Sequence, residues 1–140
     1  MFVLDTNVIS ELMRPAGSDR VFNWISRQSP ALLFTTSVTQ AEIFFGLSIM
    51  PDGRRKDLLM KAAQTMFVQD FAERILPFDM ASSLVYADIR SRRQQTGAPI
   101  SVFDAQIAAI TKLYSATLVT RNIPDFRDCD ITLINPWTDD

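Results

Sequence analysis

The 140-residue sequence, with 47% hydrophobic and 21% charged residues, excludes an intrinsically disordered chain and predicts one folded domain over residues 1–140. A net charge of −2 excludes strong global attraction to nucleic acid and leaves that role to a local basic patch. The chain has no histidine and a single cysteine, which excludes histidine-based catalysis, histidine-ligated metals and an intramolecular disulfide. Without a secretory signal or a run of about 18 apolar residues, a cytoplasmic protein with no membrane contact is expected.

Short apolar runs alternate with longer amphipathic ones, which predicts strands alternating with helices. Strands are predicted at residues 2–4, 31–36, 75–78, 116–120 and 131–134. Helices are predicted at residues 6–14, 18–28, 37–50, 52–75, 79–97 and 101–115. Ser18 and Asp79 are expected as N-caps, and Gly97 as a C-cap. This order indicates an α/β fold with a mainly parallel sheet of four to five strands, covered by helices on both faces.

Four acidic residues follow the predicted strands closely. Asp5 ends the first strand, Glu42 lies early in the helix after the second, Asp104 lies in the first turn of the helix beginning near Ser101, and Asp125 follows the fourth strand. Because parallel strands end at the same sheet edge, these acids are expected to converge there. Converging carboxylates repel one another unless a cation compensates them, and Mg²⁺ or Mn²⁺ prefers oxygen ligands.

Each acid also has a purely structural interpretation. Asp5 is a suitable N-cap, Thr39-x-x-Glu42 fits a capping box, and Ser101-x-x-Asp104 is a weaker version of that motif. Asp125 can cap a turn beside a proline. Capping alone, however, does not require all four acids to lie on one edge of the sheet.

The residues near these acids fit a phosphate-binding site. Gly46 lies one helical turn after the glutamate, where it either leaves room for a substrate backbone or permits tight helix packing. Thr6 and Ser101 can hold a water or a substrate group, although local capping explains both hydroxyls equally well. Arg121 offers a phosphate-binding fork, and the amide oxygen of Asn122 can ligate a cation or orient a carboxylate.

Four motifs in order make the sequence similar to a known family. DTNVISEL, T-x-x-E-I-x-x-G, ISVFDAQIAA and LVTRNIPDF followed by INPW resemble the PIN-domain family, and within it the VapC and FitB-like toxins of type II toxin–antitoxin modules. The resemblance extends from Met1 to about Trp137. It implies a PIN-like three-layer sandwich and an Mg²⁺- or Mn²⁺-dependent endoribonuclease that cleaves single-stranded RNA regions, often in tRNA or rRNA. It also implies a homodimer and a cognate antitoxin, with operator DNA bound only through that antitoxin.

The family's acidic positions match this chain at Asp5, Glu42 and Asp104. For the fourth position the match is divided, because some members have Asp where this chain has Asn122, while Asp125 stands three residues later. As a hypothesis, the three matched acids hold one metal that activates a water, and the fourth position completes or orients the shell. Arg121 or Arg14 would steady the phosphate.

Two other functions compete with the nuclease. The chain can be mainly an interaction module that forms a DNA-binding regulatory complex with its antitoxin, using the apolar helix at residues 57–75, although core packing also explains that helix. A phosphatase or another phosphoryl-transfer enzyme on a different fold is disfavoured by the lack of a glycine-rich phosphate loop. The basic clusters at residues 54–56 and 90–93 are each typical of a solvated helix face, and Arg90 and Arg93 are alternatively expected to line an RNA groove.

Overall fold

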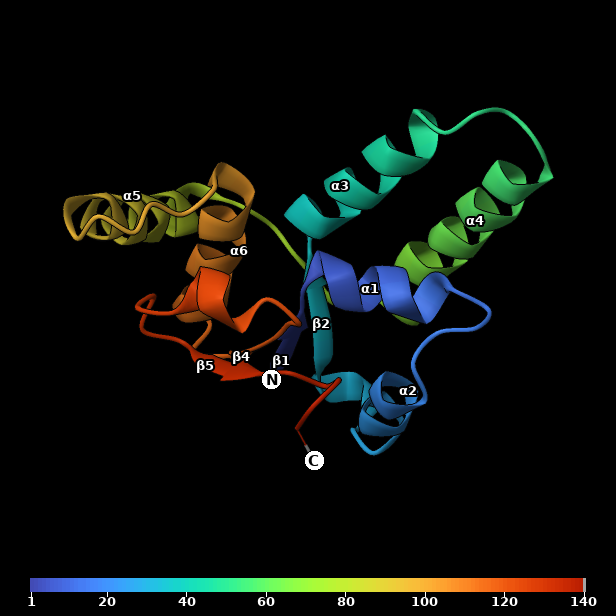
Figure 1. Cartoon of the computed structure of the whole chain (residues 1–140), viewed down its shortest axis with the longest axis horizontal. Coiled ribbons are helices and arrows are strands. Elements are labelled where there is room, and N and C mark those ends of the chain that lie inside the picture. Colours follow the sequence, from blue (N-terminus) through green and yellow to red (C-terminus); the bar gives the residue numbers. More distant parts are fainter. Residues whose placement is uncertain (140) are drawn as a thin grey trace.

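A five-stranded sheet forms the centre of the computed structural model, which describes residues 1–139 (Figure 1). Its strands are β1 (Phe2–Leu4), β2 (Leu33–Thr36), β3 (Ile75–Leu76), β4 (Thr117–Val119) and β5 (Thr132–Ile134). They lie in the order β3-β2-β1-β4-β5, and every neighbouring pair is parallel. The mainly parallel sheet expected from the alternating pattern is therefore confirmed.

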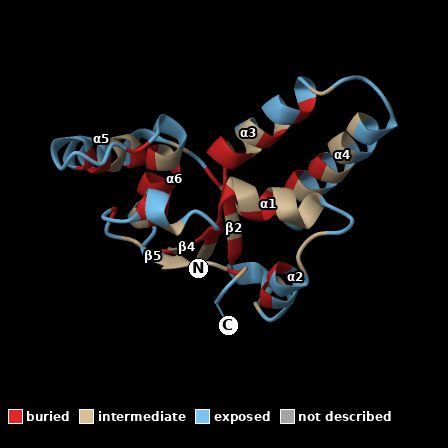
Figure 2. Cartoon of the chain, in the orientation of Figure 1, coloured by how far each residue is buried: buried red, intermediate tan, exposed pale blue. Residues whose placement is uncertain are grey.

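Six α-helices cover the two faces of the sheet, giving three layers (Figures 1 and 2). They are α1 (Thr6–Met13), α2 (Asp19–Ser26), α3 (Ser37–Ser48), α4 (Arg54–Thr65), α5 (Met80–Gln95) and α6 (Val102–Leu113). Successive strand residues point to opposite faces, so Val3 joins the core under α5 and α6 while Leu4 joins the core under α1, α2 and α4. Among residues 1–139, no helix is long and apolar enough to cross a membrane.

The predicted N-caps agree with the structure, whereas the C-cap of α5 is Thr96, one residue before the predicted Gly97. The Ser18 side chain accepts from the Val21 N–H, and Asp79 and Ser82 form a reciprocal capping box. Gly97 follows the last helical turn of α5 with a φ of 77°, the left-handed conformation that favours glycine. These local signals fix where α2 and α5 begin and where α5 ends.

The long helix predicted at residues 52–75 is shorter than expected. It begins at Arg54, changes to a π-helix at Met66–Asp70, and gives way to β3 at Ile75. The Arg74 guanidinium donates to the carbonyl oxygens of Pro30, Leu33 and Asp70, and the Thr35 N–H donates to the Arg74 carbonyl. Pairing with β2 therefore outweighs the helical preference of this segment.

Helix α6 packs against the sheet through a buried face that contains several small side chains. Ala105, Ala108 and Ala109 have no exposed surface, and they alternate with the equally buried Ile107 and Ile110. Alanine side chains let the helix axis approach the strands and leave little freedom for the helix to shift. The start of α6 is consequently held rigidly near the carboxyl edge of the sheet.

Candidate metal centre

Asp5 lies at the carboxyl end of β1 and is 4% exposed. Its Oδ1 accepts from the Thr6 N–H at 2.8 Å, so Asp5 is the N-cap of α1, as one interpretation of the sequence predicted. Its Oδ2 accepts from the Thr120 hydroxyl at 2.8 Å. Burial raises the pKa of Asp5 to about 6, the two hydrogen bonds oppose that rise, and the charges of Asp104 and Glu42 add to it.

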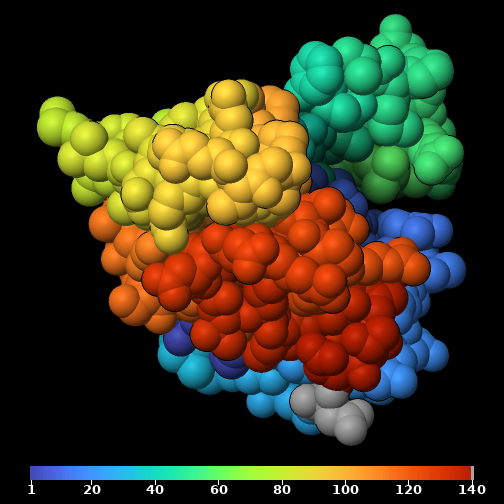
Figure 3. All heavy atoms as spheres, turned by 60° about the vertical axis from the view of Figure 1, so that its left-hand side comes forward, coloured from blue at the N-terminus to red at the C-terminus, as the bar shows by residue number. Residues whose placement is uncertain are grey.

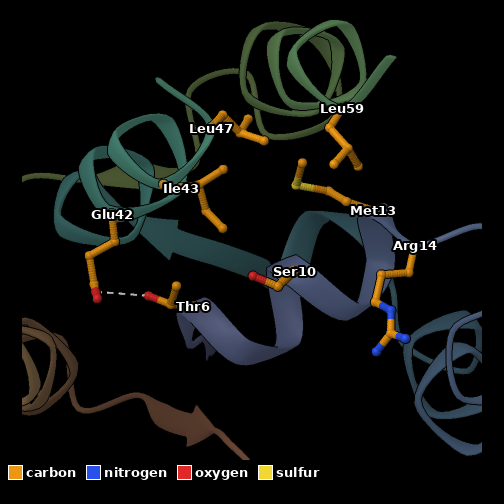
Figure 4. A pocket seen from close by; sticks show the side chains of 9 residues that line it. Thr6, Ser10, Met13, Arg14, Glu42, Ile43, Leu47 and Leu59 are labelled. Atoms are coloured by element: carbon orange, nitrogen blue, oxygen red, sulfur yellow. Dashed lines mark hydrogen bonds between the residues drawn. The ribbon is translucent and has the colours of Figure 1, made fainter. Parts of the chain in front are cut away.

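Glu42 does not belong to a capping box. Thr36, not Thr39, is the N-cap of α3, and its hydroxyl accepts from the Thr39 N–H at 3.0 Å. The Glu42 carboxylate accepts from the Thr6 hydroxyl at 2.9 Å, which joins α3 to the start of α1 (Figure 4). Burial raises the pKa of Glu42, the Thr6 hydrogen bond lowers it, and the charge of Asp104 raises it. The side chain is thus turned toward the carboxyl edge of the sheet.

Asp104 is half-buried in the first turn of α6, where its N–H donates to the Ser101 hydroxyl at 3.2 Å. Ser101 is therefore the N-cap of α6, as expected. Burial raises the pKa of Asp104, the Ser101 hydroxyl opposes that rise, the Asp125 charge adds to it, and Arg93 opposes it. Electrostatic coupling thus links Asp104 to Asp5 and Glu42 on one side and to Asp125 on the other.

The fourth acid lies at the outer end of this group. Asp125 is exposed in the short 3₁₀ helix Ile123–Phe126, which the buried Phe126 ring anchors to the core. Asn122 is also exposed, and its N–H donates to the Thr120 hydroxyl at 3.0 Å. Both side chains are therefore free to turn toward a ligand, and both stay candidates for the fourth position.

The two predicted phosphate-binding arginines differ in their surroundings. The Arg121 guanidinium lies over the Trp137 ring, 5.1 Å from its centroid, and the Arg121 N–H donates to the Asn7 side chain. Arg14 is exposed at the end of α1, with Nη1 3.6 Å from the Glu11 carboxylate, and it lines a pocket of about 340 Å³ that also contains Glu42. Arg14 thus lines the same pocket as one of the candidate ligands.

Thr120 is a functional residue that the sequence analysis missed. Its hydroxyl donates to Asp5 Oδ2 and accepts from the Asn122 N–H and from the Asn7 amide at 3.3 Å. A signal was available, because Leu4 pairs with Val119 in the sheet, which places the next residue of each strand side by side. The network holds the Asp5 carboxylate in one orientation.

Arg93 lines a surface pocket beside Arg92, but its guanidinium is held in hydrogen bonds within the protein. It is 6% exposed, and it donates to the carbonyl oxygens of Ala98, Asp125 and Arg127. The chain turn at Gly97 brings the Ala98 carbonyl to the guanidinium, and the segment around the short 3₁₀ helix Ile123–Phe126 supplies the other two. Only Arg90 of the expected pair remains on the surface.

The donor set suits a hard cation. None of the ion pairs found among residues 1–139 involves Asp5, Glu42 or Asp104, and the charge of Arg93 only partly offsets the raised pKa of Asp104. Carboxylate and hydroxyl oxygens without nitrogen or sulfur are the ligands that Mg²⁺ and Mn²⁺ accept. Within residues 1–139 no three acidic side chains are close enough to share an ion as they stand, so shared coordination requires them to turn toward one another.

A model of the PIN domain matches residues 2–130. The chain belongs to the PIN-domain family. It is 37% identical over 139 residues to toxin FitB of Neisseria gonorrhoeae, covering 99% of this chain and 100% of that protein. It is 36% identical to VapC ribonuclease Y4jK of Sinorhizobium fredii over 98% of both chains. The solved structure of FitAB bound to an IR36 DNA fragment superimposes with a TM-score of 0.93 and 36% identity over 100% of this chain and 98% of that one. The resemblance and the PIN-like fold predicted from the motifs are confirmed.

The Thr120 network of this PIN domain leads to a first prediction. Thr120→Val removes the hydrogen bond that lowers the Asp5 pKa, so that pKa should rise above its value of about 6. Carboxyl ¹³C NMR during a pH titration measures the change. Thr111→Val is the matched control, because this buried hydroxyl donates to the Ile107 carbonyl within α6. An Asp5 titration that is the same in both variants would show that Thr120 does not tune the carboxylate.

Proposed function

We propose that this PIN-domain protein is the toxin of a type II toxin–antitoxin module and acts as an Mg²⁺- or Mn²⁺-dependent endoribonuclease on single-stranded RNA regions, including those of tRNA or rRNA. The observation that carries the proposal is the convergence of Asp5, Glu42 and Asp104 from three distant segments into one electrostatically coupled group. The similarity to a relative named as a VapC ribonuclease supports the same activity.

Asp5, Glu42 and Asp104 would hold the ion, and Asp125 or Asn122 would complete its shell. When bound, the ion supplies Lewis-acid chemistry, lowering the pKa of a water molecule and neutralising phosphate charge. The protein's own contribution is orientation: hydrogen bonds from Thr120 and the Thr6 amide fix the Asp5 carboxylate.

Other side chains orient Glu42 or bind the phosphate group of the substrate. The Thr6 hydroxyl holds Glu42 and leaves its second carboxylate oxygen available. Arg14, which lines the same pocket as Glu42, is placed to bind a phosphate oxygen, and Arg121, whose N–H donates to the Asn7 side chain, is a second candidate for that role. With no histidine in the chain, proton transfer to the leaving ribose oxygen falls to water or a protonated carboxyl group.

The partners follow from the same proposal. A cognate antitoxin blocks the site in the cytoplasm, the toxin forms a homodimer, and operator DNA is contacted only through the antitoxin. The superimposed solved structure of FitAB, a complex bound to a DNA fragment, supports an assembly of this kind. Several apolar side chains are exposed on α3, at its C-cap and on α4, among them Phe45, Ile49 and Leu58, and surfaces of this composition favour protein contacts.

Cleavage by antitoxin-free protein tests the nuclease. Mixed-sequence single-stranded RNA and total tRNA are incubated with Mg²⁺, with Mn²⁺ or with EDTA, beside the variant Asp104→Asn. Fragments are expected with either metal and should be absent with EDTA and in the variant, whose circular dichroism should match the wild type. Activity that survives both EDTA and Asp104→Asn would contradict the carboxylate-held metal.

The second candidate function is an interaction module that forms a regulatory complex, and the same assay tests it. Two exposed residues, Leu58 in the first half of α4 and Val68 just beyond its end, favour a partner surface, whereas Phe67 and Phe71 pack into the core. Folded protein that binds metal and antitoxin but cuts neither RNA would favour the regulatory complex as the main activity. The apolar helix predicted to provide that surface therefore contributes to both the core and the exterior.

A further inference from the structure

A continuous groove leads from the carboxylates to a group of arginines. Its inner part is the pocket of about 340 Å³ beside Glu42, with apolar walls formed by Met13 of α1, Ile43 of α3 and Leu59 of α4 (Figure 4). Its outer part is a hollow of about 760 Å³ that shares Arg14 and Leu59 with the first and adds Arg54 and Arg55. The metal ligand Glu42 thus lies at one end of the groove, and three positive charges lie at the other.

The carboxyl edge of the sheet is open to solvent between the α3–α4 pair and the α5–α6 pair. Figure 3 shows the pair standing away from α5 and α6, with a hollow between them in which the N-terminal part of the chain is visible. A strand of nucleic acid can therefore reach the carboxyl edge of the sheet from outside. The groove lined by α1, α3 and α4 leads away from that edge.

Gly46 keeps the inner part of the groove open. A Cβ built on Gly46 would have no atom within 4 Å, so the glycine is not needed for helix packing, which was one of its two interpretations from the sequence. Glycine inside a helix is unfavourable relative to alanine, and Gly46 lies inside α3. Its small size therefore benefits only a molecule that occupies the groove.

The charges at the outer end suit a polyanion. Arg54 and Arg55 are exposed in the first turn of α4, and Arg14 has only a loose ion pair with Glu11 at 3.6 Å. The neighbouring Lys56 is already paired with Asp52 at 3.3 Å. The arginines thus provide a local basic patch on a chain whose net charge is −2.

We propose that single-stranded RNA lies along this groove, with an unstacked base in the apolar pocket beside Gly46 and neighbouring phosphates on Arg14, Arg54 and Arg55. Unpaired RNA combines flat apolar bases with a charged backbone, and it matches a groove that is apolar in one part and basic in the next. The proposal rests on the nuclease function proposed above. Binding can nevertheless be measured without cleavage, so the two can fail separately.

The first test removes the outer charges. Fluorescence anisotropy of a short labelled single-stranded RNA, in EDTA to prevent cleavage, is compared for wild type, Arg54→Ala/Arg55→Ala and Arg27→Ala/Arg92→Ala. The first variant should bind roughly tenfold more weakly, and the magnitude of the slope of log affinity against log salt should fall by about 1.4, because each phosphate contact on single-stranded nucleic acid contributes about 0.7. The control loses the same charge at the end of α2 and on α5, at two exposed positions that do not line the groove (Figure 1). An equal loss of RNA affinity in both variants would contradict RNA binding along this groove.

The second test fills the groove without removing a charge. Gly46→Met should block RNA binding, whereas Gly46→Ala adds one carbon in open space and should bind like wild type. Both variants replace an interior helical glycine with a better helix former, so thermal unfolding should show no loss of stability. Wild-type affinity in Gly46→Met would contradict an occupant of this pocket.

The combined outcomes separate the groove from the nuclease. RNA binding that these variants weaken, together with a wild-type protein that cuts nothing in Mg²⁺ or Mn²⁺, would support the groove and contradict the nuclease. If the variants instead weaken binding of the cognate antitoxin and leave RNA binding unchanged, the groove holds a protein partner and the RNA proposal is wrong.

Discussion

Asp5→Asn is expected to abolish RNA cleavage and, at the same time, to stabilise the metal-free protein. The carboxylate is 4% exposed, and its neighbours in the site include two further acids rather than a cationic side chain. Loss of this candidate ligand should lower cleavage by more than about 100-fold, beyond the effect typical of residues that only orient a ligand. Asn remains a good N-cap, so α1 should keep its hydrogen bond to Thr6.

The gain in stability follows from the pKa of Asp5. The unfolded chain releases this proton near the ordinary pKa of 3.8, but the folded protein retains it until about pH 6. Between these values the folded state binds more protons, so the free energy of unfolding falls as pH rises and the cost is complete above about pH 6. The rise in the Asp5 pKa from 3.8 to about 6 corresponds to a loss of at most about 3 kcal/mol in the free energy of unfolding at neutral pH. Asp5→Asn removes this loss, but the weakened hydrogen bond with Thr120 offsets part of the gain.

Thermal unfolding from acidic to neutral pH, with and without Mn²⁺, measures both effects. Without metal, Asp5→Asn should unfold at a higher temperature than wild type at neutral pH, and the difference should disappear below about pH 4. Mn²⁺ should stabilise wild type and have little effect on the variant, because only the native wild-type site binds it. Asp88→Asn, which removes an exposed acid paired with Arg92, is the control. It should neither raise the unfolding temperature at neutral pH nor remove the stabilisation by Mn²⁺. A variant less stable than wild type at every pH would show that Asp5 has a structural role alone.

Local sequence signals predicted the parts of the fold that depend on neighbouring residues. The alternation of apolar runs located all five strands, and the caps at Ser18 and Asp79 are where the residue types indicated. The position of Asp5 at a strand end, Glu42 on the following helix and Asp104 in a first turn also followed from the pattern. Parallel pairing then brings these positions to one edge, and this step needs only the general geometry of such sheets.

Features that depend on distant contacts could not be predicted. The helix after Arg54 ends early because Arg74 and β3 pair with residues about forty positions earlier in the chain. Thr36 and Thr39 are both good N-caps, and only the end of β2 decides between them. Arg93 shares its helix with exposed arginines, and no local pattern distinguishes it from Arg92, because the carbonyls that surround it come from other segments.

Arg93→Met is the second substitution with a large expected effect. The guanidinium donates to the carbonyl oxygens of Ala98 at 2.6 Å, Asp125 at 3.0 Å and Arg127 at 2.8 Å, and it contacts the buried Cys129 sulfur at 3.4 Å. Methionine fills similar space but leaves these carbonyls without a donor. Hydrogen bonds from a charged group contribute about 1.5–3 kcal/mol each, and these three are only partly buried, so we expect the free energy of unfolding to fall by about 3–5 kcal/mol.

Urea unfolding of Arg93→Met, Arg93→Lys and Arg92→Met measures the effect. Arg92 is exposed on the same helix and pairs with Asp88 at 3.0 Å, so its loss should cost no more than about 0.5 kcal/mol. Lysine keeps the charge but presents one nitrogen, and it should restore stability only in part. Hydrogen exchange should locate the loss at residues 123–129, which carry Asp125 and are tied to α5 through Arg93. If Arg93→Met were as stable as Arg92→Met, the buried guanidinium would not hold this segment in place. If it were unstable but normally protected there, the cost would arise within α5, and the orientation of Asp125 would depend on the Phe126 ring instead.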